Sequence, residues 1–237
     1  MEVKLIGAIP DVEKIIASSS KSTRSKSADK ILAEIDLIEA RKHLGRLMSY
    51  GHEGAAEFAF FIFSVNNVSR VCTHQLVRHR IASYLQMSSR HVDLSEYEFI
   101  TPPSIQENAE ALKVYSNFII DAKKRYKELL NLGIEKEDAR FLLPDSIGTH
   151  IVIGMNARSL NNFFGHRLCG NAQWEIRQLA QKMRDLVKDI TPSLFWAENR
   201  PCIIRGFCPQ KPSCKYVATK AFKREREKYL MGYPHEQ

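Results

Sequence analysis

The sequence predicts an α+β protein in which an antiparallel sheet is flanked by long helices. Two short runs, FAFFIFSV (58–65) and THIVIGM (149–155), are rich in aromatic or β-branched residues and have the length of buried strands. Residues 107–132 instead repeat apolar side chains at helical spacing, which is typical of a long amphipathic helix. The sequence contains no internal repeat.

The length and composition limit the number of domains and the kinds of protein that this chain can be. The chain has 237 residues, 44% of them hydrophobic, which suits one large domain or two small ones; we favour a single domain over residues 1–237. No apolar run approaches the roughly 20 residues needed to cross a bilayer. The N-terminal residues also lack the apolar region of a signal peptide. We therefore expect a cytoplasmic protein with no membrane contact.

The net charge of +8 suits an anionic ligand or a nucleic acid, but much of it lies near the carboxyl end. Seven Lys and Arg residues between positions 211 and 228 face only Glu225 and Glu227. Such a run is most often a solvated helix face or a tail. We interpret residues from about 205 to 237 as a basic C-terminal extension.

The five cysteines are too scattered for a secreted disulfide scaffold. Cys72 falls on the apolar side of a predicted helix and is interpreted as core, not nucleophile. Cys202, Cys208 and Cys214 are separated by five residues each, whereas zinc ribbons use gaps of about two to four. The spacing favours core packing or a disulfide, and no metal site is predicted.

The first third of the chain has three predicted elements. Val3 to Ile9 is a short strand ended by Pro10, and the polar run from Ser18 to Ser27 is a loop. From Ala28 the apolar residues recur at helical spacing until Gly51 ends the helix.

After the strand at 58–65, which Asn66-Asn67 bounds, residues 68–77 are predicted to form a short helix leading into Arg78. If that helix continues through Arg78, Gln75 and Arg78 share one face. Pro102-Pro103 are expected to exclude regular structure. Helices then follow at 107–132, ended by Gly133, and at 136–142, before Pro144.

Asn156 follows the strand at 149–155 and is a suitable helix cap. The helix it begins places Arg158 and Asn162 four residues apart on one face, with Arg167 at its far end. A last amphipathic helix spans residues 172–190 and stops at Thr191-Pro192.

Basic and hydroxyl-bearing side chains are concentrated in the stretch from His74 to His91. Arg78-His79-Arg80 is followed by Ser88-Ser89-Arg90, and the stretch contains no Asp or Glu. Guanidinium groups and hydroxyls together match phosphate or carboxylate oxygens. The stretch is therefore either an anion site or a solvated basic turn.

The order of these residues resembles the signature of the flavin-dependent thymidylate synthases (the ThyX family). Arg-His-Arg, seven residues and then Ser88 match it, as do Gln75 and the Ser88-Ser89-Arg90 ending. Further similarities run from about His52 to Arg167, roughly half of the chain. They include Ala139-Arg140 before Leu143-Pro144, and the segment from Asn156 to Arg167.

The resemblance implies a ThyX-like fold and a methyltransferase that converts dUMP to dTMP. In that family 5,10-methylenetetrahydrofolate supplies the carbon, reduced FAD supplies a hydride and NADPH re-reduces the flavin. No covalent enzyme nucleophile is needed. The family also implies a homotetramer whose active sites combine residues from several chains.

Site residues follow from the same resemblance. Arg167 is the expected catalytic residue and is expected to bind the uracil base. The expected dUMP ligands are Gln75, Arg78, Gln86, Ser88, Ser89, Arg90, Arg140 and Arg167. The expected FAD ligands are Gly54, Arg78, His79, Arg80, Gln86, Asn156, Arg158 and Asn162.

Some assignments have competing interpretations. Arg167 also suits a cation that stabilises a helix C-terminus, and His52 suits a helix C-cap. Gly54 stands where the family usually has Ser or Thr, so any flavin contact there must come from backbone. Gln86 replaces a frequent Glu, which rules out an acid/base role, and His91 replaces a frequent aromatic residue.

Two other functions are compatible with the sequence. A basic RNA-binding module would use the 211–228 charges and the arginine stretch, but the sequence has no aromatic–basic stacking motif. A nucleotide-binding enzyme that needs no flavin would leave Arg158 and Asn162 without a role.

Overall fold

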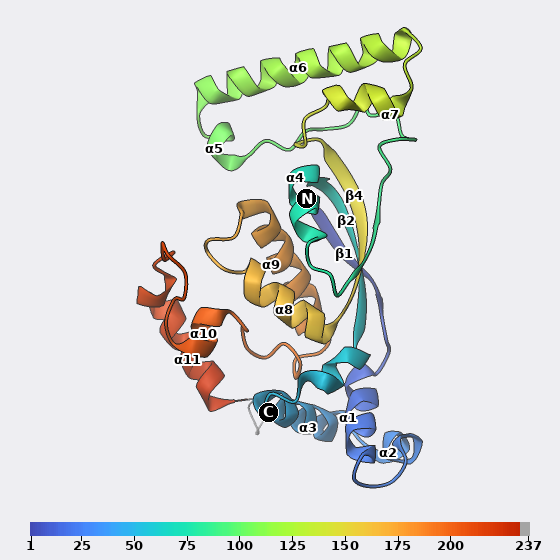
Figure 1. Ribbon diagram of the computed structural model, residues 1–237. Helices are drawn as coiled ribbons and strands as arrows, with labels where there is room; N and C mark the ends of the chain where they lie inside the picture. The colour runs from blue at the N-terminus through green and yellow to red at the C-terminus, as the bar shows by residue number, and fades with distance from the viewer. Residues whose placement is uncertain (233–237) are drawn as a thin grey trace. The chain divides into compact units, whose positions relative to one another are not determined.

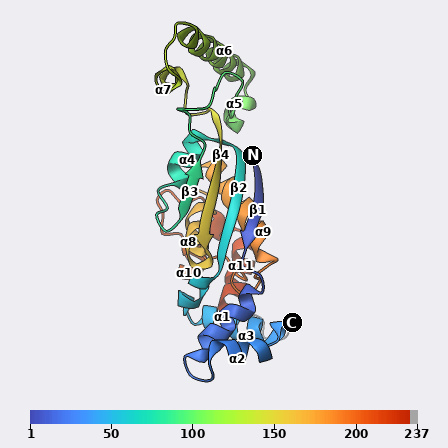
Figure 2. The same ribbon diagram turned by 90° about the vertical axis from the view of Figure 1, so that its right-hand side faces the viewer.

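The computed structural model describes residues 1–232 and contains a four-stranded antiparallel sheet (Figures 1 and 2). The strand order is β1-β2-β4-β3, so β4 pairs with two strands that precede it in the sequence. This architecture confirms the predicted α+β class, and the strands predicted near residues 3, 58 and 149 are all present. The strands are β1 Glu2–Ala8, β2 Phe60–Ser69, β3 Ser83–Gln86 and β4 Gly148–Asn156.

The chain divides into two compact units. Unit 1 comprises Met1–Glu2, Ser64–Arg78 and Tyr84–Val152, and unit 2 comprises Val3–Phe63, His79–Ser83 and the chain from Ile153. Unit 1 contains α4 Arg70–Leu76, α5 Pro103–Gln106, α6 Ala109–Asn131, α7 Lys136–Ala139 and the 3₁₀ helix η2 Arg140–Leu142. Unit 2 contains α1 Val12–Ser22, α2 Ala28–Glu34, α3 Leu37–Ser49, α8 Ala157–Arg167, α9 Trp174–Lys188, α10 Pro201–Arg205 and α11 Lys220–Met231, with the 3₁₀ helices η1 Glu53–Phe58 and η3 Tyr216–Ala218.

The core of unit 1 forms beneath the long helix α6. Tyr126 is fully buried there, with Leu94, Met87 and Ile147 around it. The Leu94 backbone N–H donates to the Tyr126 hydroxyl at 3.3 Å, which gives the one polar atom of that ring a partner. Gly133 follows α6 with φ of +80°, the left-handed conformation that ends helices, as predicted.

The core of unit 2 is aromatic. Phe164 of α8 packs against both Phe163 and Phe195, with ring centroids 5.9–6.0 Å apart, and Phe61 of β2 contacts Phe195 at 6.0 Å. Asn156 caps α8 by accepting the Ser159 backbone N–H at 2.8 Å, as predicted. Such caps contribute about 1 kcal/mol, so this one fixes where the helix begins.

The loop predicted from Ser18 to Ser27 is wrong in its first half, because α1 continues to Ser22. Ser18 and Ser19 donate their hydroxyls to backbone carbonyl oxygens four residues earlier, at 2.7 and 2.9 Å. These bonds satisfy the polar side chains within the helix. Ser18 and Ser19 are therefore compatible with a helix, although their side chains offer little apolar surface to the core.

The single helix predicted from Ala28 to Gly51 is two helices. α2 ends at Glu34, and Asp36 then caps α3 by accepting the Glu39 backbone N–H at 2.7 Å. Ile31 and Ile35 are both buried. Ile38 continues the same apolar spacing beyond the break, although its side chain is 72% exposed, and this spacing conceals the break in the sequence.

The region after the second strand also differs from prediction. β2 runs through Asn66-Asn67 to Ser69, with Asn67 in the left-handed region at φ of +54°, which Asn tolerates. Helix α4 ends at Leu76, so it does not continue through Arg78 and the expected helical face is not formed.

Several short elements escaped prediction, among them α5 and β3. Pro103 does not exclude regular structure, because it occupies the first turn of α5, where a missing N–H costs nothing. Strand β3 has only four residues, too few for a periodic signal.

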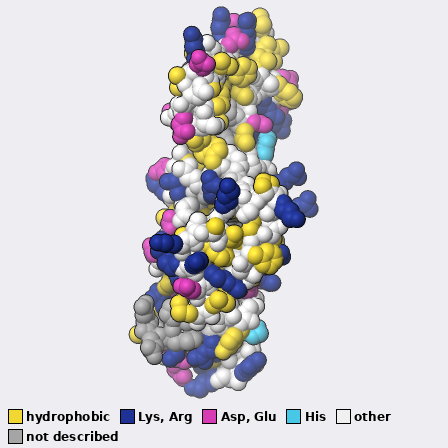
Figure 3. Space-filling view, turned by 90° about the vertical axis from the view of Figure 1, so that its left-hand side faces the viewer, with side chains coloured by type: hydrophobic (Ala, Val, Ile, Leu, Met, Phe, Trp, Pro, Cys, Tyr) yellow, Lys and Arg dark blue, Asp and Glu magenta, His cyan; other side chains and the backbone are white. Residues whose placement is uncertain are grey.

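Residues 220–231 form helix α11, whose basic residues are mostly exposed, so the predicted solvated helix face is confirmed there. Figure 3 shows Lys and Arg side chains spread over this face of the molecule. The part of the predicted extension at 233–237 lies outside the described residues. Within residues 1–232, no helix is long and apolar enough to cross a membrane.

Candidate functional site

Ser89 and Arg140 form the best-defined contact among the predicted dUMP ligands. Arg140 Nη1 donates to the Ser89 hydroxyl at 2.6 Å, and Arg140 Nε donates to the Glu137 carbonyl oxygen at 2.9 Å. Ser89 is only 5% exposed. In the described chain Arg140 makes no ion pair with a carboxylate. A guanidinium held in place with its charge uncompensated favours an anionic ligand.

Arg90 differs from Arg140 because its charge is already paired. Its Nε lies 2.6 Å from Glu137 Oε2, and both side chains are exposed. An exposed ion pair contributes only about 0–1 kcal/mol, so an anion can displace Glu137 from Arg90 at little cost. Ser88 is exposed, and its hydroxyl accepts the Arg90 backbone N–H at 3.4 Å.

Gln86 is held by two buried threonines. Its Nε2 donates to Thr73 Oγ1 at 3.0 Å and lies 3.5 Å from Thr149 Oγ1. These contacts fix the orientation of the amide. Arg78 is exposed directly after the Val77 cap of α4, while Gln75 is partly buried within that helix.

In unit 2, His79 packs into the start of α8. Its Nε2 lies 2.7 Å from the Ser159 hydroxyl, and its ring meets the Phe163 ring edge-on with centroids 5.6 Å apart. Ser159 donates its single hydroxyl proton to the Ile81 carbonyl oxygen. The His79 nitrogen must therefore be the donor to Ser159.

Burial lowers the pKa of His79, and Coulombic interactions with Arg167 and His166 lower it further, against the opposing effect of its contact with Ser159. His79 is thus a neutral ring with its proton on Nε2 near pH 7. The same interaction places the Arg167 charge close enough to affect the ring. The structure thereby brings two predicted site residues together within unit 2.

The other predicted residues of α8 are engaged in different ways. The Asn156 side-chain oxygen is used by the helix cap. Arg158 pairs with Glu57 through Nη1, and its Nε lies 3.9 Å from Glu53 Oε2. Asn162 is exposed and Arg80 is exposed beyond His79, while Arg167 is partly buried.

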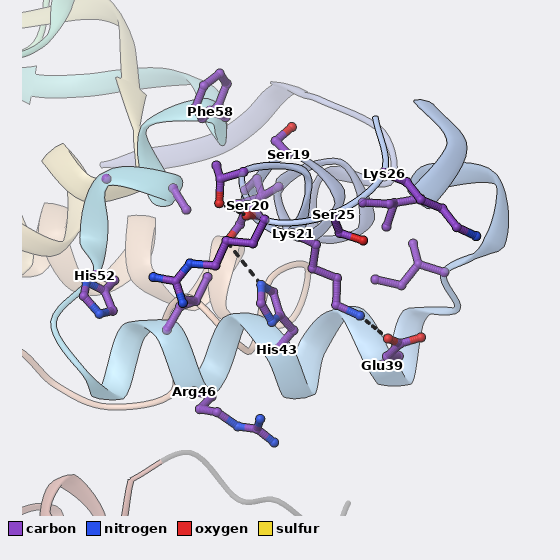
Figure 4. Close-up of a pocket in the computed structure, with 18 of the residues that line it drawn as sticks. Ser19, Ser20, Lys21, Ser25, Lys26, Glu39, His43, Arg46, His52 and Phe58 are labelled. Atoms are coloured by element: carbon purple, nitrogen blue, oxygen red, sulfur yellow. Dashed lines mark hydrogen bonds and ion pairs between the residues drawn. The ribbon is translucent and has the colours of Figure 1, made fainter. Parts of the chain in front are cut away.

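Unit 2 also contains a large cavity of about 1050 Å³, between α1, α2, α3 and η1. Gly54 and His52 line it, together with serines of the 18–27 run (Figure 4). His52 is not the C-cap of a helix, because Tyr50 caps α3 and His52 precedes η1. Ser20 Oγ lies 3.1 Å from His43 Nε2 across the cavity.

The charges around this cavity are unevenly paired. Lys21 pairs with Glu39, and Lys26 pairs with Glu34 at 2.9 Å. Arg24 and Arg46 also line the cavity and have no carboxylate partner among residues 1–232. A space of this size with two unpaired guanidinium groups can hold a ligand as large as a dinucleotide.

Sequence reasoning missed Lys21, Arg24, His43 and Arg46 as candidate ligand contacts. The available signal was the run SSSKSTRSKS, which mixes hydroxyls and cations without any acid. Its functional meaning depends on α3 lying opposite, because His43 and Arg46 come from that helix.

Comparison with known proteins gives the context for these features. A sequence profile described as "Thymidylate synthase complementing protein" (Thy1) matches residues 4–193. The chain is 44% identical over 209 residues to the flavin-dependent thymidylate synthase of Pyrococcus abyssi, covering 83% of each chain. It is 40% identical to that of Pyrococcus horikoshii, covering 97% of this chain and 100% of the relative. For the enzyme of Clostridium tetani the identity is 39%, covering 89% and 91%.

The α+β fold, the large cavity of unit 2 and the uncompensated guanidinium groups suit an enzyme that acts on small molecules. The chain belongs to the Thy1 family, the flavin-dependent thymidylate synthases, which are methyltransferases. This confirms the resemblance drawn from Arg78 to Ser88 and excludes a non-enzymatic RNA-binding module as its main function. The role of each site residue stays a prediction.

Proposed function

We propose that the chain converts dUMP to dTMP, with 5,10-methylenetetrahydrofolate as the one-carbon donor. When bound, reduced FAD supplies the hydride, and NADPH restores the reduced flavin. The observation that carries the proposal is the Ser89–Arg140 pair, a fixed hydroxyl and an uncompensated guanidinium suited to the dUMP phosphate. Relatives at 39–44% identity that are named for this activity support it.

The residues around the large cavity fit FAD. Arg24 and Arg46 suit its two phosphates, and apolar side chains such as Ile16 and Phe58 suit its rings. A Cβ atom built on Gly54 would meet no atom within 4 Å, so the absence of the family's Ser or Thr leaves open space. The Gly54 backbone can approach a ligand there. The flavin ligands predicted from the family are His79, Arg80, Asn156, Arg158, Asn162, Arg78 and Gln86.

The chain's own residues would position the substrate and stabilise charge. Arg140 and Ser89 bind the phosphate of dUMP, while Arg90 exchanges Glu137 for a phosphate oxygen. Arg167 stabilises negative charge that grows on the uracil ring as the ring becomes a nucleophile. The remaining predicted substrate contacts are Gln75, Arg78, Gln86 and Ser88.

No cysteine is required as a nucleophile in this scheme. Cys72 is fully buried in unit 1. Cys169 is partly exposed just after α8, and among the described residues its thiol forms no hydrogen bond with a base. Holding the reactants in the correct geometry then provides the protein's main contribution.

We further propose a cytoplasmic homotetramer with shared active sites, in which residues 1–237 act as one domain with a basic extension from about 205. Large apolar side chains on α6 support association: Val114, Phe118 and Ile120 are 54–72% exposed. Figure 3 shows hydrophobic side chains gathered over the α5–α6 end. Exposed apolar groups of this kind usually mark an interface.

The test is direct. The purified chain, reconstituted with micromolar FAD, should show a flavin absorbance spectrum and form dTMP from dUMP. Product formation should require both methylenetetrahydrofolate and NADPH. Failure to bind FAD would contradict the proposal. The double variant Arg24→Ala/Arg46→Ala should lose flavin. Its circular dichroism spectrum should stay like that of the wild type, which would show that the fold is retained.

A further inference from the structure

Four of the five cysteines, distant in sequence, line one narrow cavity of unit 2. Cys169 follows α8, Cys202 lies in α10, and Cys208 and Cys214 lie in the loop between α10 and η3. The cavity encloses only about 30 Å³. Such convergence is not predicted by the five-residue spacing, because it depends on α8 bringing Cys169 to the same place.

Cys208 and Cys214 are linked by a direct contact, because the Cys214 backbone N–H forms a hydrogen bond with the Cys208 thiol. The Cys208 thiol donates to the Gln210 carbonyl oxygen at 3.8 Å, so the loop between them folds back over the sulfur. Cys214 packs against the end of α8, because a Cβ atom built on Gly170 would lie 2.9 Å from Cys214 Cβ and 3.0 Å from its Sγ. Both thiols are partly exposed, and reagents in solution can therefore reach them.

The two ends of the cavity differ in thiol acidity. A hydrogen bond from the Ser213 side chain, with backbone hydrogen bonds at Gln210 and Cys214, lowers the pKa of Cys208. The Ser213 oxygen in turn accepts the Lys215 backbone N–H at 3.1 Å, which holds it in place. Burial instead raises the pKa of Cys202. Cys208 therefore carries more of the reactive thiolate form than Cys202.

The geometry distinguishes a thiol couple from a metal centre. Within residues 1–232, no three His, Cys, Asp or Glu side chains stand close enough to hold a metal ion, although four thiols share the cavity. None of the five cysteines forms a disulfide in this structure.

We propose that Cys208 and Cys214 form a reversible dithiol–disulfide couple, with Cys208 as the attacking thiol and a low-molecular-weight disulfide as the oxidant. The Cys208 thiolate attacks one sulfur of the oxidant, forming a mixed disulfide and releasing one thiolate. Deprotonated Cys214 then attacks the Cys208 sulfur and releases the second thiolate. Two protein thiols are oxidised, one disulfide is reduced to two thiols, and the two protein protons pass to the released thiolates.

The sequence makes the test simple. Trypsin does not cleave the Lys211–Pro212 bond, so Cys208 and Cys214 fall in one peptide, GFCPQKPSCK (206–215), whereas Cys169 and Cys202 fall in two others. The full-length reduced protein is incubated with glutathione disulfide, alkylated with iodoacetamide, digested and analysed by mass spectrometry. We expect this peptide to lose two hydrogen atoms and to escape alkylation, and dithiothreitol to reverse the change.

Variants test the assigned roles. Cys214→Ser should stop at one glutathione attached to Cys208, while Cys208→Ser should abolish the disulfide. Ser213→Ala should slow oxidation about two- to tenfold, the loss expected from one hydrogen bond. Cys72→Ala, remote in sequence and buried, is the matched control and should change nothing.

Three results would overturn the proposal: full alkylation of both thiols after oxidation, a disulfide joining Cys169 to Cys202 instead, or about one zinc ion per chain that protects all four thiols. The readout is thiol chemistry, so it does not depend on dTMP formation. Failure of the proposed function would leave the test unaffected.

Discussion

Arg140 in unit 1 and Arg158 in unit 2 are both predicted to bind anionic groups, yet the structure surrounds them differently. Arg140 donates only to a hydroxyl and a backbone carbonyl oxygen. Arg158 pairs with Glu57 and lies 3.9 Å from Glu53. No carboxylate among the described residues neutralises the positive charge of Arg140, so that charge can interact with an anionic ligand. The second has that charge largely balanced by carboxylates.

The difference shows that the electrostatic value of an arginine depends on its neighbours, not on its motif alone. A carboxylate within about 4 Å competes directly with an incoming phosphate. Arg158 therefore contributes chiefly by joining η1 to α8, and its anion contact comes only when a ligand displaces Glu57. Arg140 has no such competitor among the described residues.

Arg167→Ala should reduce dTMP formation on the order of a hundredfold or more, because one electrostatic contact to developing charge is lost. Arg167→Lys should also be impaired, since Lys keeps the charge but not the planar fork. Flavin content should stay normal in both variants, because the flavin contacts are assigned elsewhere. Loss of flavin would mean that Arg167 serves the cofactor, and near-normal turnover would remove it from catalysis.

Arg140→Ala should weaken dUMP binding roughly tenfold to a hundredfold, the loss expected for charge-assisted hydrogen bonds of about 1.5–3 kcal/mol. Arg158→Ala is the matched comparison and should change dUMP affinity much less. Isothermal titration with dUMP on the FAD-loaded variants measures both. Equal losses in the two variants would contradict the distinction drawn from their carboxylate neighbours.

His79 should make stability depend on pH. Its folded pKa is lowered, mainly by burial, from the ordinary 6.5. Below pH 6.5 the unfolded chain therefore binds a proton that the folded chain does not, so stability falls as pH falls toward the folded pKa. Above pH 6.5 the contribution of neutral His79 is fully present.

Thermal unfolding of the wild-type protein and of His79→Gln, followed between pH 5 and 8, measures this effect. The variant should show a shallower loss on acidification. His43→Gln is a second test of the same effect, because burial also lowers the pKa of His43 and its variant should flatten the same window independently. An unchanged pH dependence in His79→Gln would mean that the pKa of the ring does not differ between the folded and the unfolded chain, which would contradict the lowered pKa.

Glu57→Gln should have the smallest effect. Glu57 and Arg158 are about half exposed, and pairs of this kind contribute below about 1 kcal/mol. Urea unfolding should therefore differ little from wild type, with Glu53→Gln as the control. A loss of several kcal/mol would show that the pair is a structural requirement of the η1–α8 contact.

The sequence alone determined the class of fold and most element positions. Local composition and periodicity decide these features: β4 and α6 are long, regular and strongly apolar on one face, and Asn156 carries its own capping group. The resemblance to the family from Arg78 to Arg167 could also be recognised in the sequence, because it depends only on the order of the residues.

Elements with weak or misleading local signals could not be predicted. The break at Ile35–Asp36 is hidden because apolar residues recur at helical spacing on both sides of it, and Ile31 before the break and Leu44 after it are both buried. The four residues of β3 have too few side chains to show a period, and their strand pairing comes from β4, which lies far along the chain.

Only the tertiary structure decided which charges are paired. Arg158 and Glu57 are 101 residues apart, and Arg140 and Ser89 are 51 residues apart. The sequence gives the position of each arginine in the chain, but it does not tell which side chains lie within about 4 Å of the guanidinium group. The same holds for the four thiols of the small cavity, because their reactivity depends on neighbours that folding supplies.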